Sequence, residues 1–329
     1  MILPFESGSW SWGDVEHRPA TLDGRRCTAA SGFGVVLADV ELQDGTIELE
    51  LAVGRERAFH GVVWRARDTE NYESFFVRPH QVGNSDAIQY TPVFNGISSW
   101  QLYHGDGFWA AVGFPLGEWF RIRIVFAGDR AETYVTDLEE PALVSVLKAP
   151  ADAGRVGVLV GGPDVHLGAF ACHQETRFRV PPPTKPAARP EVVREWDVSD
   201  AFPESLGELA LAETRTWTTI ESEPSGLVNL ARVQGICDGR NTVLARTRIH
   251  ADQAVTRRLE LGFSDRAVVY LNGVALYRGD DTYRSRDYRF LGSIGWYDAL
   301  YLPLVEGDNE LVVAVSEELG GWGVQARLR

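Results

Sequence analysis

Apolar and polar residues alternate with a period of two along several short stretches of the chain. In residues 46–53, Ile47, Leu49, Leu51 and Val53 alternate with Thr46, Glu48, Glu50 and Ala52. Successive side chains of a β-strand point to opposite faces, so this alternation predicts a half-buried antiparallel strand. The pattern recurs at four further sets of positions: Phe120, Ile122, Ile124 and Phe126; Val255, Leu259, Leu261 and Phe263; Ala267, Val269 and Leu271; and Leu311, Val313 and Val315.

Turn residues separate these stretches. The chain contains 33 glycines, and Asn272-Gly273 is a dipeptide that tolerates the positive φ angles of a tight hairpin. Ser264-Asp265 predicts a second turn, and residues 204–211 are the clearest helical candidate. Short strands separated by many turns favour β-sandwiches over a parallel α/β sheet.

The chain length of 329 residues fits two domains of ordinary size. A proline-rich stretch near residues 181–190 cannot supply a regular hydrogen-bond ladder and favours extended geometry. The sequence therefore predicts an all-β protein of two antiparallel β-sandwich (jelly-roll) domains in tandem. We place the first at residues 1–180, the linker at 181–191 and the second domain at 192–329.

Composition narrows the classes of partner. Acidic residues outnumber basic ones by 46 to 32, and the formal charge of -14 disfavours nucleic acid and anionic membrane surfaces. No stretch approaches the ~20 apolar residues of a membrane span. The three cysteines show no C-x-x-C pair and are expected to be reduced and mostly buried. The amino terminus lacks a signal-peptide pattern, which indicates a cytoplasmic protein, or a secreted one if the sequence starts at a mature terminus.

Residues 40–172 have the strand layout of the concanavalin A-like lectin/glucanase superfamily and most resemble its laminin-G-like members. The resemblance is carried by Gly45-Thr46-Ile47-Glu48-Leu49-Glu50, Gly61-Val62-Val63-Trp64-Arg65, residues 71–78, residues 119–124 and Gly154-Arg155-Val156-Gly157-Val158. It implies a sandwich fold. Such folds host lectins, hydrolases, lyases and adhesion modules, so the resemblance leaves the activity open.

Residues 242–329 resemble the galactose-binding-like sandwich that accompanies β-galactosidase-type enzymes. The carriers are residues 242–249, Tyr270-Leu271-Asn272-Gly273, Leu302-Pro303-Leu304, residues 307–311 and Gly320-Gly321-Trp322-Gly323-Val324. Members of that family bind sugars or brace a neighbouring domain, and the resemblance does not choose between these uses.

The densest group of polar and aromatic residues lies in the first half of the chain. A saccharide site needs a flat apolar face together with fixed hydrogen-bond donors and acceptors. The candidate ligand-binding residues are Arg78, His80, Asp86, Gln89, Tyr90, Asn95, Trp100 and Gln101. A purely structural reading is also open, in which Tyr90 and Trp100 fill the core and Asn95 only forms a turn.

Catalysis is a second possibility, with His80, Asp86 and Glu73 as the candidate catalytic residues. Arg78, His80, Gln89 and Tyr90 supply the residue types of a polysaccharide lyase without a recognised spacing. Glu48 and Glu50 share a strand face roughly 7 Å apart, but the E-x-D-x-E motif of retaining glucanases is incomplete. A solvated strand face explains the two glutamates better. The likeness to 3-keto-disaccharide hydrolases extends to the sandwich alone.

The second half offers another candidate binding patch, comprising Tyr283, Arg284, Arg286, Asp287, Trp296 and Trp322. Its charged residues are equally typical of a surface ion network, and its tryptophans of interface anchors. The histidine spacings encode no compact metal site, so we predict no metal and no cofactor, while a structural calcium ion stays open.

Three functions follow from these observations. The leading one is a carbohydrate-binding, lectin-like protein whose first sandwich presents loops to an oligo- or polysaccharide. The alternatives are a glycan-active enzyme, either a glycoside hydrolase or a lyase, and a non-catalytic protein-interaction module. The sequence does not decide the glycan, the oligomeric state or the orientation of the domains.

Overall fold

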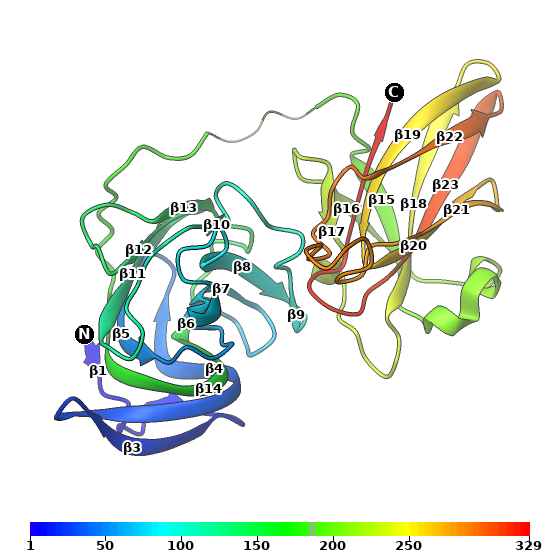
Figure 1. Ribbon diagram of the computed structural model, residues 1–329. Coiled ribbons are helices and arrows are strands. Elements are labelled where there is room, and N and C mark those ends of the chain that lie inside the picture. Colours follow the sequence, from blue (N-terminus) through cyan, green and yellow to red (C-terminus); the bar gives the residue numbers. More distant parts are fainter. Residues whose placement is uncertain (185–186, 188) are drawn as a thin grey trace. The chain divides into compact units, whose positions relative to one another are not determined.

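The computed structural model describes residues 1–184, 187 and 189–329. Within these residues the chain forms antiparallel strands, and its helices are three short 3₁₀ segments, η1 (Pro79–Gln81), η2 (Glu204–Leu211) and η3 (Leu230–Arg232) (Figure 1). The prediction of an all-β fold is confirmed. The described part of the chain contains no helix whose length and hydropathy would let it cross a lipid bilayer.

Contacts divide the chain into two compact units. Unit 1 comprises Met1–Val93 and His104–Lys185, and unit 2 comprises Phe94–Tyr103 and Pro186–Arg329. The predicted boundaries keep residues 94–103 with the first domain, whereas their contacts place this segment in unit 2. The predicted linker, 181–191, includes Lys185, Pro186 and Ala188, which lie outside the described residues.

The strands up to residue 173 belong to one hydrogen-bonded sheet. They are β1 (Ile2–Leu3), β2 (Trp10–Ser11), β3 (Glu16–Leu22), β4 (Arg25–Leu42), β5 (Gly45–Val53), β6 (His60–Ala66), β7 (Tyr72–Val77), β8 (Ile88–Phe94), β9 (Ile97–Ser98), β10 (Trp109–Ala110), β11 (Phe120–Ala127), β12 (Arg130–Val135), β13 (Leu143–Val146) and β14 (Gly154–His173). The main path runs β10-β8-β7-β6-β14-β5-β11-β12-β13, and β4 also pairs with β14.

Two long strands, β4 and β14, turn this sheet into a sandwich (Figure 1). The first part of β14 pairs with β6 and its last part with β5, so a single strand belongs to both layers. The register of β14 against β4 shifts after Gly162, which lies opposite Gly32. Their φ angles of +136° and +113° suit glycine alone, and these two residues allow the strands to bend.

The core of unit 1 lies between the two layers. The predicted inward residues of β5 and β11, from Ile47 to Val53 and from Phe120 to Phe126, are buried in one cluster together with Trp64, Phe75 and Tyr90. The Trp64 and Phe126 rings lie 5.9 Å apart. On the outer face of β5, Glu48 and Glu50 pair with Arg123 and Arg25, as expected for a solvated strand face.

Unit 2 contains two antiparallel sheets. The larger has the order β16-β15-β18-β23-β20-β21 and the smaller β17-β24-β19-β22. Their bounds are β15 (Glu195–Ser199), β16 (Trp217–Glu221), β17 (Leu227–Asn229), β18 (Thr242–Ala251), β19 (Val255–Ser264), β20 (Arg266–Leu271), β21 (Val274–Asp280), β22 (Asp298–Leu304), β23 (Gly307–Ser316) and β24 (Gly323–Leu328).

Side chains from both sheets are fully buried in unit 2, among them Trp196, Val313, Leu261 and Phe263, and so is Trp322, which precedes β24. The predicted turn at Ser264-Asp265 carries the chain from the smaller sheet to the larger one. The Asn272-Gly273 hairpin joins β20 and β21 with φ angles of +49° and +80°, as predicted. Val255, predicted to face inward, is 41% exposed at the start of β19, although its partner Leu304 on β22 is buried.

Gln101 anchors the segment Phe94–Tyr103 within unit 2. Its side-chain Nε2 donates to the carbonyl oxygen of Leu291 at 2.7 Å, and its Oε1 accepts from the Ser264 hydroxyl at 3.1 Å. Its main-chain N–H donates to Gly320 at 2.8 Å, and its carbonyl accepts from Ile294 at 3.0 Å. The side chain is fully buried, so these hydrogen bonds tie the segment into the unit.

Candidate functional site

The hairpin of β7 and β8 presents four of the predicted ligand-binding residues together. Phe76 pairs with Gln89 across the two strands, and Phe75 and Val77 point into the core, so alternation turns Phe76, Arg78 and Gln89 to the opposite face. His80 follows in η1, and Asp86 precedes β8. We call Arg57, Phe59, Phe76, Arg78, His80, Asp86 and Gln89 the β7–β8 cluster.

Arg78 is the fixed member of this cluster. Its Nη1 donates to the main-chain carbonyl of Asp86 at 2.7 Å, and its Nη2 donates to Oε1 of Gln89. The guanidinium lies over the Phe76 ring, 4.9 Å from the centroid. Burial lowers the pKa of Arg78 to about 10, so the group keeps its charge at neutral pH. These contacts hold it in one orientation.

His80 and Arg57 form the accessible part of the cluster. The half-buried His80 ring lies edge-on to Phe59 with centroids 5.6 Å apart, and Arg57 lies over the same ring at 5.7 Å. Burial lowers the pKa of His80, and the charges of Arg57 and Arg78 lower it further. In the part of the chain that the structure describes, His80 Nδ1 is buried without a hydrogen-bond partner. A neutral imidazole, a guanidinium and a ring edge therefore lie side by side.

Two other predicted residues, Glu73 and Tyr90, point to the opposite face of the hairpin. Glu73 is fully buried, and its Oε2 accepts from the Tyr90 hydroxyl at 2.7 Å. Its Oε1 accepts from the main-chain N–H groups of Ala149 at 2.9 Å and Lys148 at 3.1 Å. Burial raises the pKa of the Glu73 carboxyl. The structure thus places these two residues in the core, away from the β7–β8 cluster.

The remaining predicted residues of the first half, Asn95, Trp100 and Gln101, belong to unit 2. Asn95 has a φ of +48° in the turn after β8, and its side chain donates to the carbonyl of Ala231 at 2.8 Å. Gln101 is the buried anchor described above. Of the eight predicted ligand-binding residues, four therefore lie in the β7–β8 cluster, Tyr90 lies in the core and three lie in a segment of unit 2.

The predicted residues of the second half do not form one patch either. Arg286 bridges Asp281 at 2.6 Å and Asp298 at 2.8 Å. Trp322 is fully buried and donates its indole N–H to Val315 at 3.0 Å, which makes it a core residue. Trp296 is half-buried beneath the guanidinium of Arg327, 4.5 Å from its ring.

Tyr283, Arg284 and Asp287 lie in the loop between β21 and β22. The Arg284 guanidinium lies over the neighbouring Tyr283 ring at 4.9 Å. Oδ1 of Asp287 accepts from the main-chain N–H of Arg289 at 2.6 Å, which stabilises the turn. These contacts are local to the loop.

Sequence reasoning missed a groove in unit 2. Its volume is about 690 Å³, within the range of ligand pockets. It is lined by Pro190, Glu191, Val192, Val193, Arg194, Glu195, Asp197, Arg246, Thr247, Arg248, Ile249, His250, Arg257, Glu310 and Leu328. The alternation of Arg246 and Arg248 with buried Ala245 and Ile249 is the signal that would have placed charged residues on this face.

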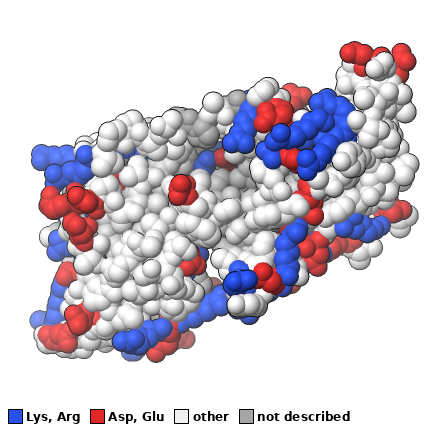
Figure 2. Space-filling model, turned by 45° about the horizontal axis from the view of Figure 1, so that its top comes forward, with Lys and Arg blue, Asp and Glu red and all other residues white. Residues whose placement is uncertain are grey.

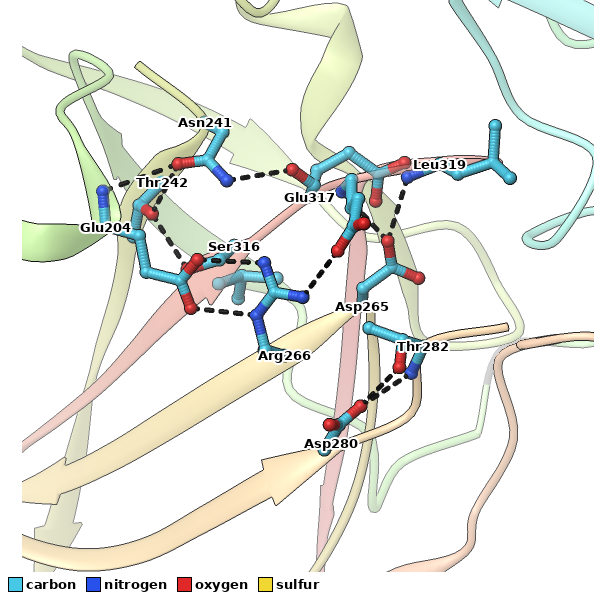
Figure 3. Close-up of polar contacts among 12 residues, drawn as sticks. Glu204, Asn241, Thr242, Asp265, Arg266, Asp280, Thr282, Ser316, Glu317 and Leu319 are labelled. Carbon is cyan, nitrogen blue, oxygen red and sulfur yellow. Dashed lines mark hydrogen bonds and ion pairs between the residues drawn. The ribbon is translucent and has the colours of Figure 1, made fainter. Parts of the chain in front are cut away.

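A second missed feature is a pair of buried acids, Asp265 and Glu317 (Figure 3). Oδ2 of Asp265 accepts from the main-chain N–H groups of Glu318 at 2.8 Å and Leu319 at 2.9 Å. Oε1 of Glu317 accepts from the main-chain N–H of Gly321 at 2.9 Å. The second oxygen of each carboxyl is buried and has no hydrogen-bond partner among the described residues.

Burial sets the ionisation of this pair. Burial raises the pKa of Asp265 to about 6, and burial together with the nearby charge of Asp265 raises the pKa of Glu317 to about 8. At neutral pH Glu317 therefore holds a proton. Within the described residues no three or more His, Cys, Asp or Glu side chains are grouped to hold a metal ion.

No protein-family model and no curated protein sequence matches the chain. Several solved structures are similar to part of it. A carbohydrate binding module, CBM66, from Bacillus subtilis shows 14% identity and a TM-score of 0.40, covering 50% of this chain and 95% of that one. A protein of unknown function with a galectin-like fold, also from Bacillus subtilis, shows 12% identity and a TM-score of 0.40, covering 54% and 96%.

Galectin-Ib from Xenopus laevis shows 16% identity and a TM-score of 0.32, covering 43% of this chain and 99% of that one. At these identities and TM-scores the similarities assign neither a family nor a function to this chain.

Proposed function

We propose that the protein binds a saccharide at the β7–β8 cluster of unit 1. The observation that carries this proposal is the convergence of Arg57, Phe59 and His80 around a fixed Arg78. A sugar presents hydroxyl groups that accept from guanidinium and exchange hydrogen bonds with imidazole, and C–H groups that pack against an aromatic ring. The cluster offers all three kinds of group.

The unpartnered nitrogen of His80 supports the same proposal. A buried polar atom without a hydrogen bond costs free energy, about 1–3 kcal/mol in general. In this proposal a ligand hydroxyl supplies the hydrogen-bond partner that this nitrogen lacks within the described part of the chain. Because the pKa of His80 is lowered, the ring is neutral at pH 7 and can both accept and donate a hydrogen bond.

We also propose that unit 1 is a laminin-G-like sandwich and unit 2 a galactose-binding-like one. The support for the first is the bent pair β4 and β14, which joins two antiparallel layers. The support for the second is the Tyr270-Leu271-Asn272-Gly273 hairpin, whose φ angles suit that turn. In this proposal unit 1 carries the ligand site.

The test is a glycan array followed by calorimetry on the whole chain. Arg57→Ala and His80→Ala remove accessible side chains and are expected to weaken binding of the best array glycan by about tenfold or more, roughly 1.4 kcal/mol. Arg26→Ala, which removes another exposed arginine of unit 1, is the matched control and should bind like wild type. An array without any bound saccharide, or unchanged affinity in both variants, would remove the proposal.

A further inference from the structure

One face of the smaller sheet of unit 2 carries three arginines around one carboxylate. Arg258 and Glu260 lie on β19, Arg327 lies on β24 opposite Glu260, and Arg329 follows β24. Arg258 and Arg329 exchange two main-chain hydrogen bonds of 3.1 and 2.8 Å. Alternation along both strands turns these four side chains to the same face. We call them the Glu260 cluster.

Glu260 receives all three guanidinium groups. Arg258 Nη1 lies 3.1 Å from Oε1, Arg329 Nε lies 3.3 Å from Oε2, and Arg327 Nε donates to the same Oε2. Among residues 1–184, 187 and 189–329, no other Asp or Glu side chain lies within 4 Å of these three guanidinium groups. Three positive side chains thus share one negative side chain.

This excess is unusual in a chain with a formal charge of -14. On the face drawn in Figure 2, basic side chains gather into groups with acidic side chains beside them. Arg258 of β19 and Arg329, which follows β24, also lie opposite each other through their two main-chain hydrogen bonds, and like charges in this position are destabilising. This group of arginines in a chain rich in acidic residues indicates a role in binding and not in folding.

One arginine of the Glu260 cluster is held in place, and the other two are partly exposed to solvent. Arg327 is held by Glu260 and by the Trp296 ring, 4.5 Å below its guanidinium. By contrast the Arg258 and Arg329 side chains are 48% and 52% exposed, so their remaining N–H groups face solvent. Guanidinium forks match the geometry of carboxylate, sulfate and phosphate groups.

An exposed aromatic ring lies next to these donors. Tyr301 of β22 pairs with Arg258 across the strands and is 69% exposed. A ring of this kind packs against the C–H face of a sugar and leaves its hydroxyl in water. The combination of half-exposed guanidinium groups and an open ring favours a sugar that carries an anionic group over a bare inorganic ion.

We propose that the Glu260 cluster and Tyr301 bind an acidic saccharide through its carboxylate or sulfate group. Arg258 and Arg329 pair with the anion, Arg327 and Glu260 hold them in place, and Tyr301 contacts the sugar ring. The proposal does not depend on the β7–β8 cluster, because the two sites share no residue.

Calorimetry on the whole chain at low salt tests the proposal with four probes: trigalacturonate, a sulfated heparin tetrasaccharide, neutral maltotriose and inorganic sulfate. We expect one of the two acidic oligosaccharides to bind more tightly than maltotriose and sulfate. Arg258→Ala and Tyr301→Ala should each weaken that binding by about tenfold. Arg240→Ala removes an exposed arginine elsewhere in unit 2 and should leave it unchanged.

The failure of this proposal is distinct from that of the first. Arg57→Ala should not affect the acidic probe, and Arg258→Ala should not affect the array glycan bound by unit 1. The proposal is overturned if neither acidic oligosaccharide binds, if sulfate alone binds as tightly, or if Arg240→Ala weakens binding as much as Arg258→Ala. Arg258→Lys keeps the charge without the fork, and intermediate binding is expected.

Discussion

The buried pair of Asp265 and Glu317 predicts that unit 2 loses stability as the pH rises. Both carboxyls have a pKa in the folded state, about 6 and about 8, above the unfolded values near 4. At pH 3 both states hold the protons. Between pH 4 and each folded pKa the unfolded chain ionises while the folded chain does not, so the free energy of unfolding falls.

The magnitude follows from proton counting. Each proton that the folded state alone retains lowers the free energy of unfolding by about 1.4 kcal/mol per pH unit. From pH 6 to 8 Glu317 contributes most of the change, about 2 kcal/mol, because its carboxyl is half ionised at pH 8. Glu317→Gln keeps an oxygen that can accept from the Gly321 N–H, but it has no carboxyl proton to lose. The change of the free energy of unfolding with pH that Glu317 causes should therefore be absent in this variant.

The assay is urea unfolding at pH 6, 7 and 8, in which fluorine NMR of fluorotryptophan-labelled protein monitors the unfolding. Trp322 is fully buried in unit 2 and reports on that unit. Wild type should become less stable at each step, and Glu317→Gln should stay nearly constant. Glu306→Gln, which changes an exposed acid of the same unit, should retain the wild-type slope. Equal slopes for wild type and Glu317→Gln would refute the reasoning.

Two further changes probe the interior of each unit. His60 is buried, and burial lowers its pKa to about 4. The stability that the neutral His60 ring contributes to unit 1 should therefore be complete above pH 6.5 and decrease as the pH falls toward 4. The melting temperature of His60→Gln should depend less on pH over this range. Gln101→Ala leaves the Ser264 hydroxyl and the Leu291 carbonyl without their partner, and should lower the urea midpoint of unit 2 by an amount equivalent to about 2–4 kcal/mol.

The strands were predictable because local alternation sets which side chains are buried. The pattern from Ile47 to Val53 and that from Phe120 to Phe126 correspond to β5 and β11, with the predicted faces inward. The helical candidate at 204–211 forms η2, although Gly207, at a φ of +55°, divides it into two 3₁₀ turns. The strands β4 and β14 were not predicted as single elements, because glycines that resemble turn signals lie at their bend.

The candidate site was predictable only in part. Arg78, His80, Asp86 and Gln89 are close in sequence and belong to one hairpin, so local reasoning grouped them. Alternation across the same hairpin sends Tyr90 and Glu73 into the core, a distinction that requires the register. The buried acids and the Glu260 cluster join residues more than fifty positions apart, and no local pattern in the sequence reveals them.

The most direct test of saccharide binding by unit 1 is an NMR titration of the His80 ring with the best array glycan. The His80 resonances should shift with the same dissociation constant as calorimetry gives, and Arg57→Ala should need about tenfold more glycan for the same shift. Saturation of the protein with glycan while the His80 signals stay in place would contradict it.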